Sequence, residues 1–172
     1  MIYRIIAPAW RGALGMVGLI AMLIPVSAAT IRPDQAQTRF QGGLSVRLPA
    51  SQTLTVGMQG RVVRVDVPLC TTIAGGLIVA TLSGGTIVRS AHPSASLTLS
   101  TSSAGCKWYS FHLQPALAVH AGQVIQLTIA RRRGKAPLWG ANLNGRDVYR
   151  RGAGTWNEHA VQDFAFRTYV LA

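Results

Sequence analysis

Apolar and polar residues alternate along most of the chain from about residue 44 onward. Between Val63 and Leu69 every second residue is apolar, and the residues between them are Arg64, Asp66 and Pro68. Successive side chains of a β-strand point to opposite faces, so a period of two predicts a strand that buries one face. The same alternation recurs in residues 124–129 and 164–170.

Glycine-rich turns separate these alternating segments, and after residue 28 no helical apolar stripe persists over ten residues. The sequence therefore predicts an all-β fold. We expect a single-domain antiparallel β-sandwich of the jelly-roll type, with a sheet closed on itself as the alternative. The expected strands are 44–48, 52–56, 61–69, 76–82, 86–90, 96–100, 107–113, 123–130, 137–142 and 162–171.

The N-terminus has the features of an export signal. Two arginines precede an apolar run over residues 13–25, and small residues follow up to Ala28. This order is typical of a secretory signal peptide. The run is shorter than the roughly 20 apolar residues of a membrane-spanning helix, which is the alternative. We predict a signal peptide over 1–28, with cleavage after Ala29 as a variant. The mature domain would be 29–172, exported to the periplasm or the extracellular space without a further membrane span.

The predicted mature domain contains two cysteines, Cys70 and Cys106. In an oxidising compartment, an even pair in a small domain predicts a disulfide. Metal ligation is the alternative, but the two residues lack the close spacing of zinc ligands. Because Cys70 ends one expected strand and Cys106 precedes another, we expect the bridge to tie two strand ends across the rim of the sandwich.

The chain is strongly basic. Its formal net charge is +12, and loss of the two arginines in the leader lowers the charge to +10. Nearly all the basic residues are arginines, whose planar guanidinium forms bidentate contacts with carboxylate, phosphate or sulfate. A base composition of the gene that favours arginine codons is the alternative explanation. A basic exported domain is suited to an anionic partner.

The chain contains Asp34-Gln35, QTLTVG at 52–57 and, near the C-terminus, DFAFRTYV at 163–170. These and several other segments resemble, in order, those of a class of bacterial secreted β-sandwich modules. The resemblance covers residues 33–171, and it is strongest near the C-terminus. It implies a jelly-roll sandwich like that of galactose-binding-like and carbohydrate-binding modules, but a fold of this kind does not by itself define a function. The segments that carry the resemblance are Asp34-Gln35, QTLTVG at 52–57, WYSF at 108–111, VHAGQVIQ at 119–126, Tyr149 with Gly152, Trp156, and DFAFRTYV at 163–170.

Residues for catalysis are sparse. A glycosidase needs two carboxylates that flank the scissile bond, and the mature chain has only five acidic residues, with no pair expected to converge. No G-x-S-x-G motif is present, and the four histidines lack the spacing of helical metal-binding motifs. We therefore predict a protein that is not an enzyme and that has no metal or other cofactor.

The segment from residue 131 to 156 is the most informative for binding, because basic and aromatic residues cluster in it. Basic side chains would pair with anionic groups of a ligand, and aromatic side chains would stack on its rings. The alternative is that the arginine run is a solvated hairpin tip and Trp139 belongs to the core. The predicted ligand-binding residues are Arg131, Arg132, Arg133, Lys135, Trp139, Tyr149, Arg150, Arg151 and Trp156.

These features favour a non-catalytic exported binding module for an anionic glycan or a cell-envelope polymer. The alternative is a structural or interaction protein of the envelope that binds a protein partner. Nucleic acid is disfavoured, although single strands bind similar clusters of arginine and aromatic residues. Exposure of Trp139 and Trp156 beside the arginines would favour a glycan. Burial of these tryptophans, with an apolar patch elsewhere, would favour a protein partner.

Overall fold

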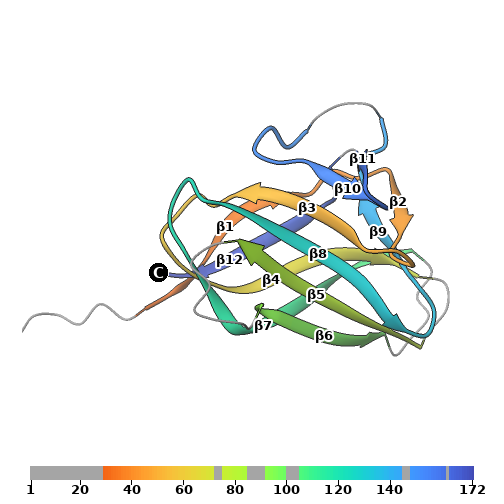
Figure 1. The fold of residues 1–172 in the computed structure, drawn as a ribbon, viewed down its shortest axis with the longest axis horizontal. Coiled ribbons are helices and arrows are strands. Elements are labelled where there is room, and N and C mark those ends of the chain that lie inside the picture. The colour runs from red at the N-terminus through yellow and green to blue at the C-terminus, as the bar shows by residue number, and fades with distance from the viewer. Residues whose placement is uncertain (1–28, 72–74, 85–91, 100–104, 145–147, 162) are drawn as a thin grey trace, which may run out of the picture.

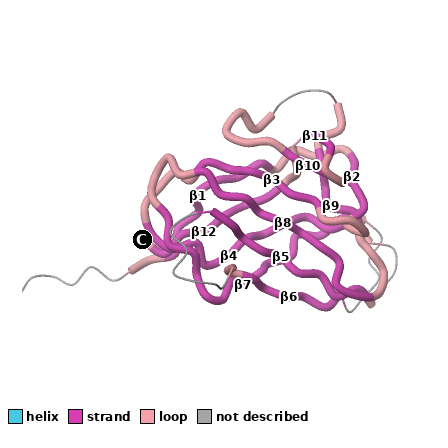
Figure 2. Tube along the Cα trace, in the orientation of Figure 1, coloured by secondary structure: helices cyan, strands magenta, loops and turns pink. Residues whose placement is uncertain are grey.

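The computed structural model describes residues 29–71, 75–84, 92–99, 105–144, 148–161 and 163–172. Within these ranges the protein consists of strands and loops, and all the strand pairs are antiparallel (Figure 2). The prediction of an all-β fold is therefore confirmed. No helix in the described ranges could cross a membrane. The predicted signal peptide and the expected strand at 86–90 lie outside the described residues.

Twelve strands are described, and they are labelled in Figure 1. Their bounds are β1 (Ile31–Gln37), β2 (Gly42–Ser45), β3 (Ala50–Thr55), β4 (Gly60–Cys70), β5 (Gly76–Gly84), β6 (Ser94–Leu99), β7 (Cys106–Val119), β8 (Val124–Arg133), β9 (Leu138–Ala141), β10 (Gly154–Trp156), β11 (His159–Val161) and β12 (Phe166–Leu171).

The strands follow the order β1-β12-β4-β7-β6-β5-β8-β3-β10-β11, and β9 pairs with both β4 and β2. The register between β6 and β7 consists of one residue pair, Ser94 with Gln114, so this narrow connection joins two halves of the sheet. The first half contains β1, β12, β4 and β7. The second half contains β6, β5, β8, β3, β10 and β11. In Figure 1, strands β3, β8 and β5 cross in front of β12 and β4.

Both halves bury one face against a common core. Alternate residues of β3, β5, β8 and β12 are buried, as the period of two predicts. Val65 and Val67 of β4 belong to the same core cluster as Leu127 and Ile129 of β8. The sheet therefore folds back over its own apolar face, and removal of these side chains from water drives the folding.

Three strands, β1, β10 and β11, were not expected from the pattern of apolar residues. Strand β1 is polar and contains Pro33, which cannot donate a hydrogen bond to a neighbouring strand. The position is tolerated because β1 lies at the end of the strand order and pairs with β12. Strands β10 and β11 have three residues each, which is too short for a periodic signal.

The predicted disulfide between Cys70 and Cys106 is confirmed. The two residues lie directly opposite each other on the neighbouring strands β4 and β7, with their Cα atoms 3.9 Å apart. The bridge joins two strand ends, as expected, since β4 ends at Cys70 and β7 begins at Cys106. The expectation that it spans the rim is wrong, because these strands are hydrogen-bonded partners within one half of the sheet. The bridge closes the end of the β4–β7 ladder.

Candidate functional site

The C-terminal end of β8 and the turn that follows carry most of the predicted basic residues. Three successive arginines end the strand, and Lys135 follows one residue after Gly134. All four basic side chains are exposed. We use the name basic end for Arg47, Arg131, Arg132, Arg133 and Lys135.

Local backbone geometry explains why the chain turns here. Gly134 has a φ of +75°, a conformation that residues with a side chain rarely adopt. A Cβ atom at Gly134 would also overlap the carbonyl oxygen of Gly75. The guanidinium of Arg131 donates a hydrogen bond of 2.8 Å to the carbonyl of Gly134. This bond orients Arg131 and leaves its other N–H groups available to a ligand.

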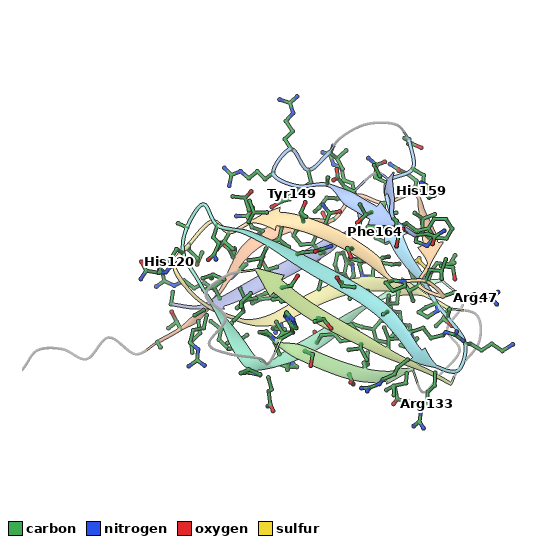
Figure 3. The ribbon with its side chains drawn as sticks, in the orientation of Figure 1. Arg47, His120, Arg133, Tyr149, His159 and Phe164 are labelled. Carbon is green, nitrogen blue, oxygen red and sulfur yellow. A yellow bond between two sulfur atoms is a disulfide. The ribbon has the colours of Figure 1, made fainter. Side chains whose placement is uncertain are left out.

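Arg47 joins this surface from another part of the chain, and the sequence reasoning missed it. The amide of Arg131 donates to the carbonyl of Val46, so the turn containing Arg47 lies beside the end of β8. Arg47 is exposed, and Figure 3 shows it at the same end of the molecule as Arg133, with His120 at the opposite end. A single arginine in a turn gives no signal in the sequence, because its proximity to β8 depends on the fold.

A depression of about 230 Å³ opens beside these arginines. Val79 of β5 and Ala130 of β8 lie opposite each other in register, and they line the depression together with Arg131 and Arg132. Its lining therefore combines an apolar floor with two guanidinium groups. This combination suits a ligand that has both an apolar face and an anionic group.

The charges of the basic end are not neutralised within the described part of the chain. Among the described residues, the ion pair joins Arg64 to Asp66, both on β4 and outside the basic end. The described side-chain carboxylates are those of Asp34, Asp66, Glu158 and Asp163, and none lies within 4.0 Å of a nitrogen atom of the basic end. An unpaired cluster of this kind attracts anions, and the attraction weakens as the salt concentration rises.

A row of hydroxyl side chains adjoins the depression on the outward face of the second half. Its members occupy directly opposed positions on β10, β3, β8, β5 and β6, and all are partly exposed. With neighbouring strands about 4.8 Å apart, the row spans roughly 19 Å. We call it the hydroxyl row, and its members are Thr155, Ser51, Thr128, Thr81 and Ser94.

Trp139 does not belong to this surface. Its side chain is fully buried, stacks on Phe164 with ring centroids 4.3 Å apart, and donates from its indole nitrogen to the carbonyl of Ala165 at 2.7 Å. The prediction that Trp139 stacks on a ligand is therefore wrong. The alternation in this short strand did not indicate which face is inward, and the apolar indole packs in the core.

Trp156 is half-buried and packs against the core. Its indole nitrogen donates to the carbonyl of Ser45 at 2.8 Å, close in sequence to Arg47. The structure therefore places Trp156 near the loop that carries Arg47, with one part of the ring accessible. Of the three predicted aromatic residues, Trp156 alone keeps partial exposure.

Tyr149 is also buried, so its predicted stacking role is wrong. Its ring packs edge-on against Phe166, at 5.0 Å between centroids, and its hydroxyl donates to the Gln35 side chain at 3.2 Å. Burial raises the pKa of the Tyr149 phenol to about 12. A buried phenol with these contacts holds β1 and β12 to the loop that precedes β10.

A polar network surrounds this tyrosine, and we call it the seam network. The Asp163 carboxylate accepts hydrogen bonds from the amides of Val148 and Tyr149, at 3.0 and 2.8 Å, and from the side chain of Gln52 at 3.4 Å. Gln52 in turn accepts from the amide of Phe164 at 2.7 Å. Four of the segments that resemble the secreted β-sandwich modules contribute residues to this network. These residues bind one another and hold the strands together.

Asp34 completes the network at the edge of β1. Its carboxylate accepts from the amide of Gly57 through both oxygen atoms, at 2.9 and 3.2 Å. Burial raises the pKa of Asp34, although hydrogen bonds from Gly57, Gln35 and Met58 and the charge of Arg151 act in the opposite direction. The carboxylate therefore anchors β1 to the turn that precedes β4.

Arg150 and Arg151 lie on the loop above this network, and both are exposed. The hydroxyl of Thr55 donates to the carbonyl of Arg151, and Thr55 is opposite Val124, the first residue of β8. Arg132 is eight residues further along β8, a distance of about 26 Å in an extended strand. The predicted binding residues are therefore divided between two separate surfaces.

Within the described ranges, no three histidine, cysteine, aspartate or glutamate side chains converge as metal ligands would. Comparison of the chain with models of protein families, with curated protein sequences and with solved structures gives no match.

Proposed function

We propose that the protein is a non-catalytic exported module that binds an anionic glycan or a related cell-envelope polymer at its basic end. One observation carries the proposal. Exposed basic side chains without a described carboxylate partner surround a depression whose floor is apolar. Guanidinium groups form strong charge-assisted hydrogen bonds with carboxylates, phosphates and sulfates, which are the anionic groups of such polymers.

The surroundings of the depression favour a glycan over a simple anion. The apolar face of a sugar ring fits against Val79 and Ala130, while an anionic substituent pairs with Arg132. Further sugar units of the same chain would lie along the hydroxyl row, where serine and threonine can donate and accept hydrogen bonds. The row crosses β8 at Thr128, which lies two residues before Ala130 and points to the same face of the strand.

The proposal also covers the type of β-fold and the N-terminal segment. We infer a β-sandwich of the jelly-roll kind, because the two halves of the sheet share one core. We also infer a signal peptide over residues 1–28. The disulfide supports export, since such bonds persist mainly in oxidising compartments.

A protein partner is the second candidate function, and one observation favours it. Leu138 and Leu143 are 41% and 46% exposed, and they lie against Gly43 and Gly42, which are successive residues of β2 and therefore face opposite sides of the strand. In the described strands β2 pairs with β9 alone, and Trp156 occupies the Ser45 carbonyl on the other edge, so the groups of that edge before Ser45 remain for a further strand. A strand edge with an exposed leucine on each side suits a protein partner that adds a strand.

The decisive experiment compares two variants that lose the same charge. One variant replaces the three arginines of β8 with alanine, and the other replaces the exposed Arg32, Arg39 and Arg61 with alanine. Both proteins are tested at low and high salt against immobilised neutral and anionic glycans.

We expect salt-sensitive binding of wild-type protein to anionic glycans, a loss of at least tenfold in affinity for the β8 variant, and a loss below threefold for the control. Equal losses in both variants would indicate attraction by net charge alone. An absence of glycan binding at low salt would refute the proposal and favour the protein partner.

A further inference from the structure

The outward face of β4, β7 and β12 carries a second arrangement of arginine and aromatic side chains. In register, Tyr169 of β12 lies opposite Arg64 of β4, and Arg167 of β12 lies opposite Asp66 of β4. Opposed residues of antiparallel strands point to the same face, so these four side chains share a surface. The face belongs to the first half of the sheet and points away from the core, whereas the basic end belongs to the second half.

Arg64 is held by two neighbours. Its guanidinium carbon lies 3.6 Å from the centre of the Tyr169 ring, and its Nε atom lies 3.2 Å from an oxygen of Asp66. The Arg64 side chain is nevertheless 30% exposed. The contact with Asp66 is an ion pair that lacks hydrogen-bond geometry, so stacking on Tyr169 is what fixes the plane of the guanidinium, whose terminal N–H groups remain at the open edge.

Arg167 is oriented in the same way by a different ring. Its guanidinium carbon lies 4.1 Å from the centre of the Trp108 ring, and the edge of Phe40 supports that ring from 6.4 Å. Arg167 is partly exposed and has no ion-pair partner among the described carboxylates. Both rings are covered by guanidinium groups, so they orient the arginines instead of offering a free face to a sugar.

The charge on this face is unbalanced. Asp66, which is 6% exposed, is the described carboxylate that pairs here, and it lies beside two guanidinium groups. The exposed His112 lies opposite Arg64 on β7. Asp66 balances the charge of Arg64, but Arg167 has no such partner among the described carboxylates. The surface therefore carries a net positive charge.

We propose that Arg64 and Arg167 form a second anion-binding site, independent of the basic end, that takes a single oxyanion group such as a carboxylate, phosphate or sulfate. The oxyanion pairs with the open edges of the two guanidinium groups. Because the rings already fix the planes of these groups and Asp66 attracts Arg64, little side-chain freedom is lost on binding. Asp66 acts as a positioning residue, since it holds Arg64 and is itself covered.

The test uses inorganic sulfate and the arginine Nε–H resonances of ¹⁵N-labelled protein. The protein carries alanine at the three arginines of β8, so that only Arg47 and Lys135 remain of the basic end, and the pH is 8. We expect the Nε–H signals of Arg64 and Arg167 to shift in a saturable manner. The signal of Arg61, an exposed residue of β4, serves as the control and should shift only linearly with sulfate.

Two substitutions separate a site from general attraction. We expect Arg167→Gln to weaken the saturable shift of Arg64 at least tenfold, and Arg167→Lys, which keeps the charge but loses the planar fork, to weaken it at least threefold. Arg61→Gln should leave it unchanged. Thermal melting confirms that each variant is folded. Linear shifts at Arg64 in the parent protein, or equal affinity in the Arg167→Lys variant, would overturn the proposal.

Discussion

The seam network yields a specific prediction, because Asp163 determines the direction of its hydrogen bonds. One oxygen of the carboxylate accepts from the amides of Val148 and Tyr149, and the other accepts from Gln52. Gln52 cannot reverse its own side-chain amide, because its oxygen accepts from the amide of Phe164. In an Asp163→Asn variant, the new NH₂ group must therefore face a donor in either orientation.

The magnitude follows from the less damaging orientation. The asparagine oxygen would keep both bonds from the loop amides, and its NH₂ group would face the Gln52 nitrogen. Hydrogen bonds to a charged group contribute about 1.5–3 kcal/mol, against about 1 kcal/mol for neutral ones, and a mispaired buried group costs about 1–3 kcal/mol. Removal of the buried charge offsets part of this loss. We expect the free energy of unfolding to fall by about 2 kcal/mol, which corresponds to a Tm lower by about 4–8 °C.

Urea unfolding followed by tryptophan fluorescence measures this change. Glu158→Gln is the matched control, because it also removes a carboxylate charge but at an exposed position. We expect the control to lie within about 0.5 kcal/mol of wild type, as most surface substitutions do. An Asp163→Asn variant as stable as wild type, or more stable, would refute the argument, since the desolvation of the carboxylate would then outweigh its hydrogen bonds.

Three further predictions concern the stability of the fold. Because the folded pKa of Tyr149 is raised to about 12, the folded protein keeps a proton that the unfolded chain loses near pH 10. Between pH 10 and 12 the free energy of unfolding of wild type should therefore fall by up to about 1.4 kcal/mol per pH unit more than that of Tyr149→Phe. Parallel pH profiles of stability for the two proteins would contradict this. Asn157 and Glu158 have positive φ angles of 49° and 65°, which glycine adopts more readily than residues with a side chain. Glu158→Gly should therefore raise the free energy of unfolding in urea by about 1 kcal/mol, whereas Glu158→Ala, which removes the same charge, should not. Equal effects of the two substitutions would show that the loss of charge is the cause. Replacement of both Cys70 and Cys106 with serine opens a loop with a sequence separation of 36. It should lower the free energy of unfolding in urea by about 4 kcal/mol. A loss below about 1 kcal/mol would contradict this and would indicate that residual pairing of β4 with β7 already restricts the unfolded chain.

The fold class could be predicted from the sequence because alternation reports directly on which side chains face the core. Val65 and Val67 are buried on one side of β4, while Arg64 points to the other side. Strand β1 could not be predicted, since its polar residues are ordered by pairing with β12 and by the contacts of Asp34 and Gln35, which are non-local.

The binding surfaces could be predicted only in part. The exposed arginines at the end of β8 follow from a run of charge that no core can bury. Trp139 and Tyr149 were assigned to the surface because they are close to those arginines in sequence, yet both are buried. The pair of Arg64 with Tyr169 was missed, since 105 positions separate the two residues and only the pairing of β4 with β12 brings them together.

The most direct test of the central claim is to map where an anionic oligosaccharide binds. Backbone amide resonances of ¹⁵N-labelled protein are recorded during titration with a sulfated oligosaccharide, and with its neutral counterpart as the control. We expect the largest saturable shifts at Val79 and at residues 130–133, with smaller shifts along the hydroxyl row, and no shifts with the neutral sugar. Shifts spread over all exposed arginines in proportion to their exposure, or centred on Leu138 and Leu143, would contradict the assignment of the basic end as the binding site.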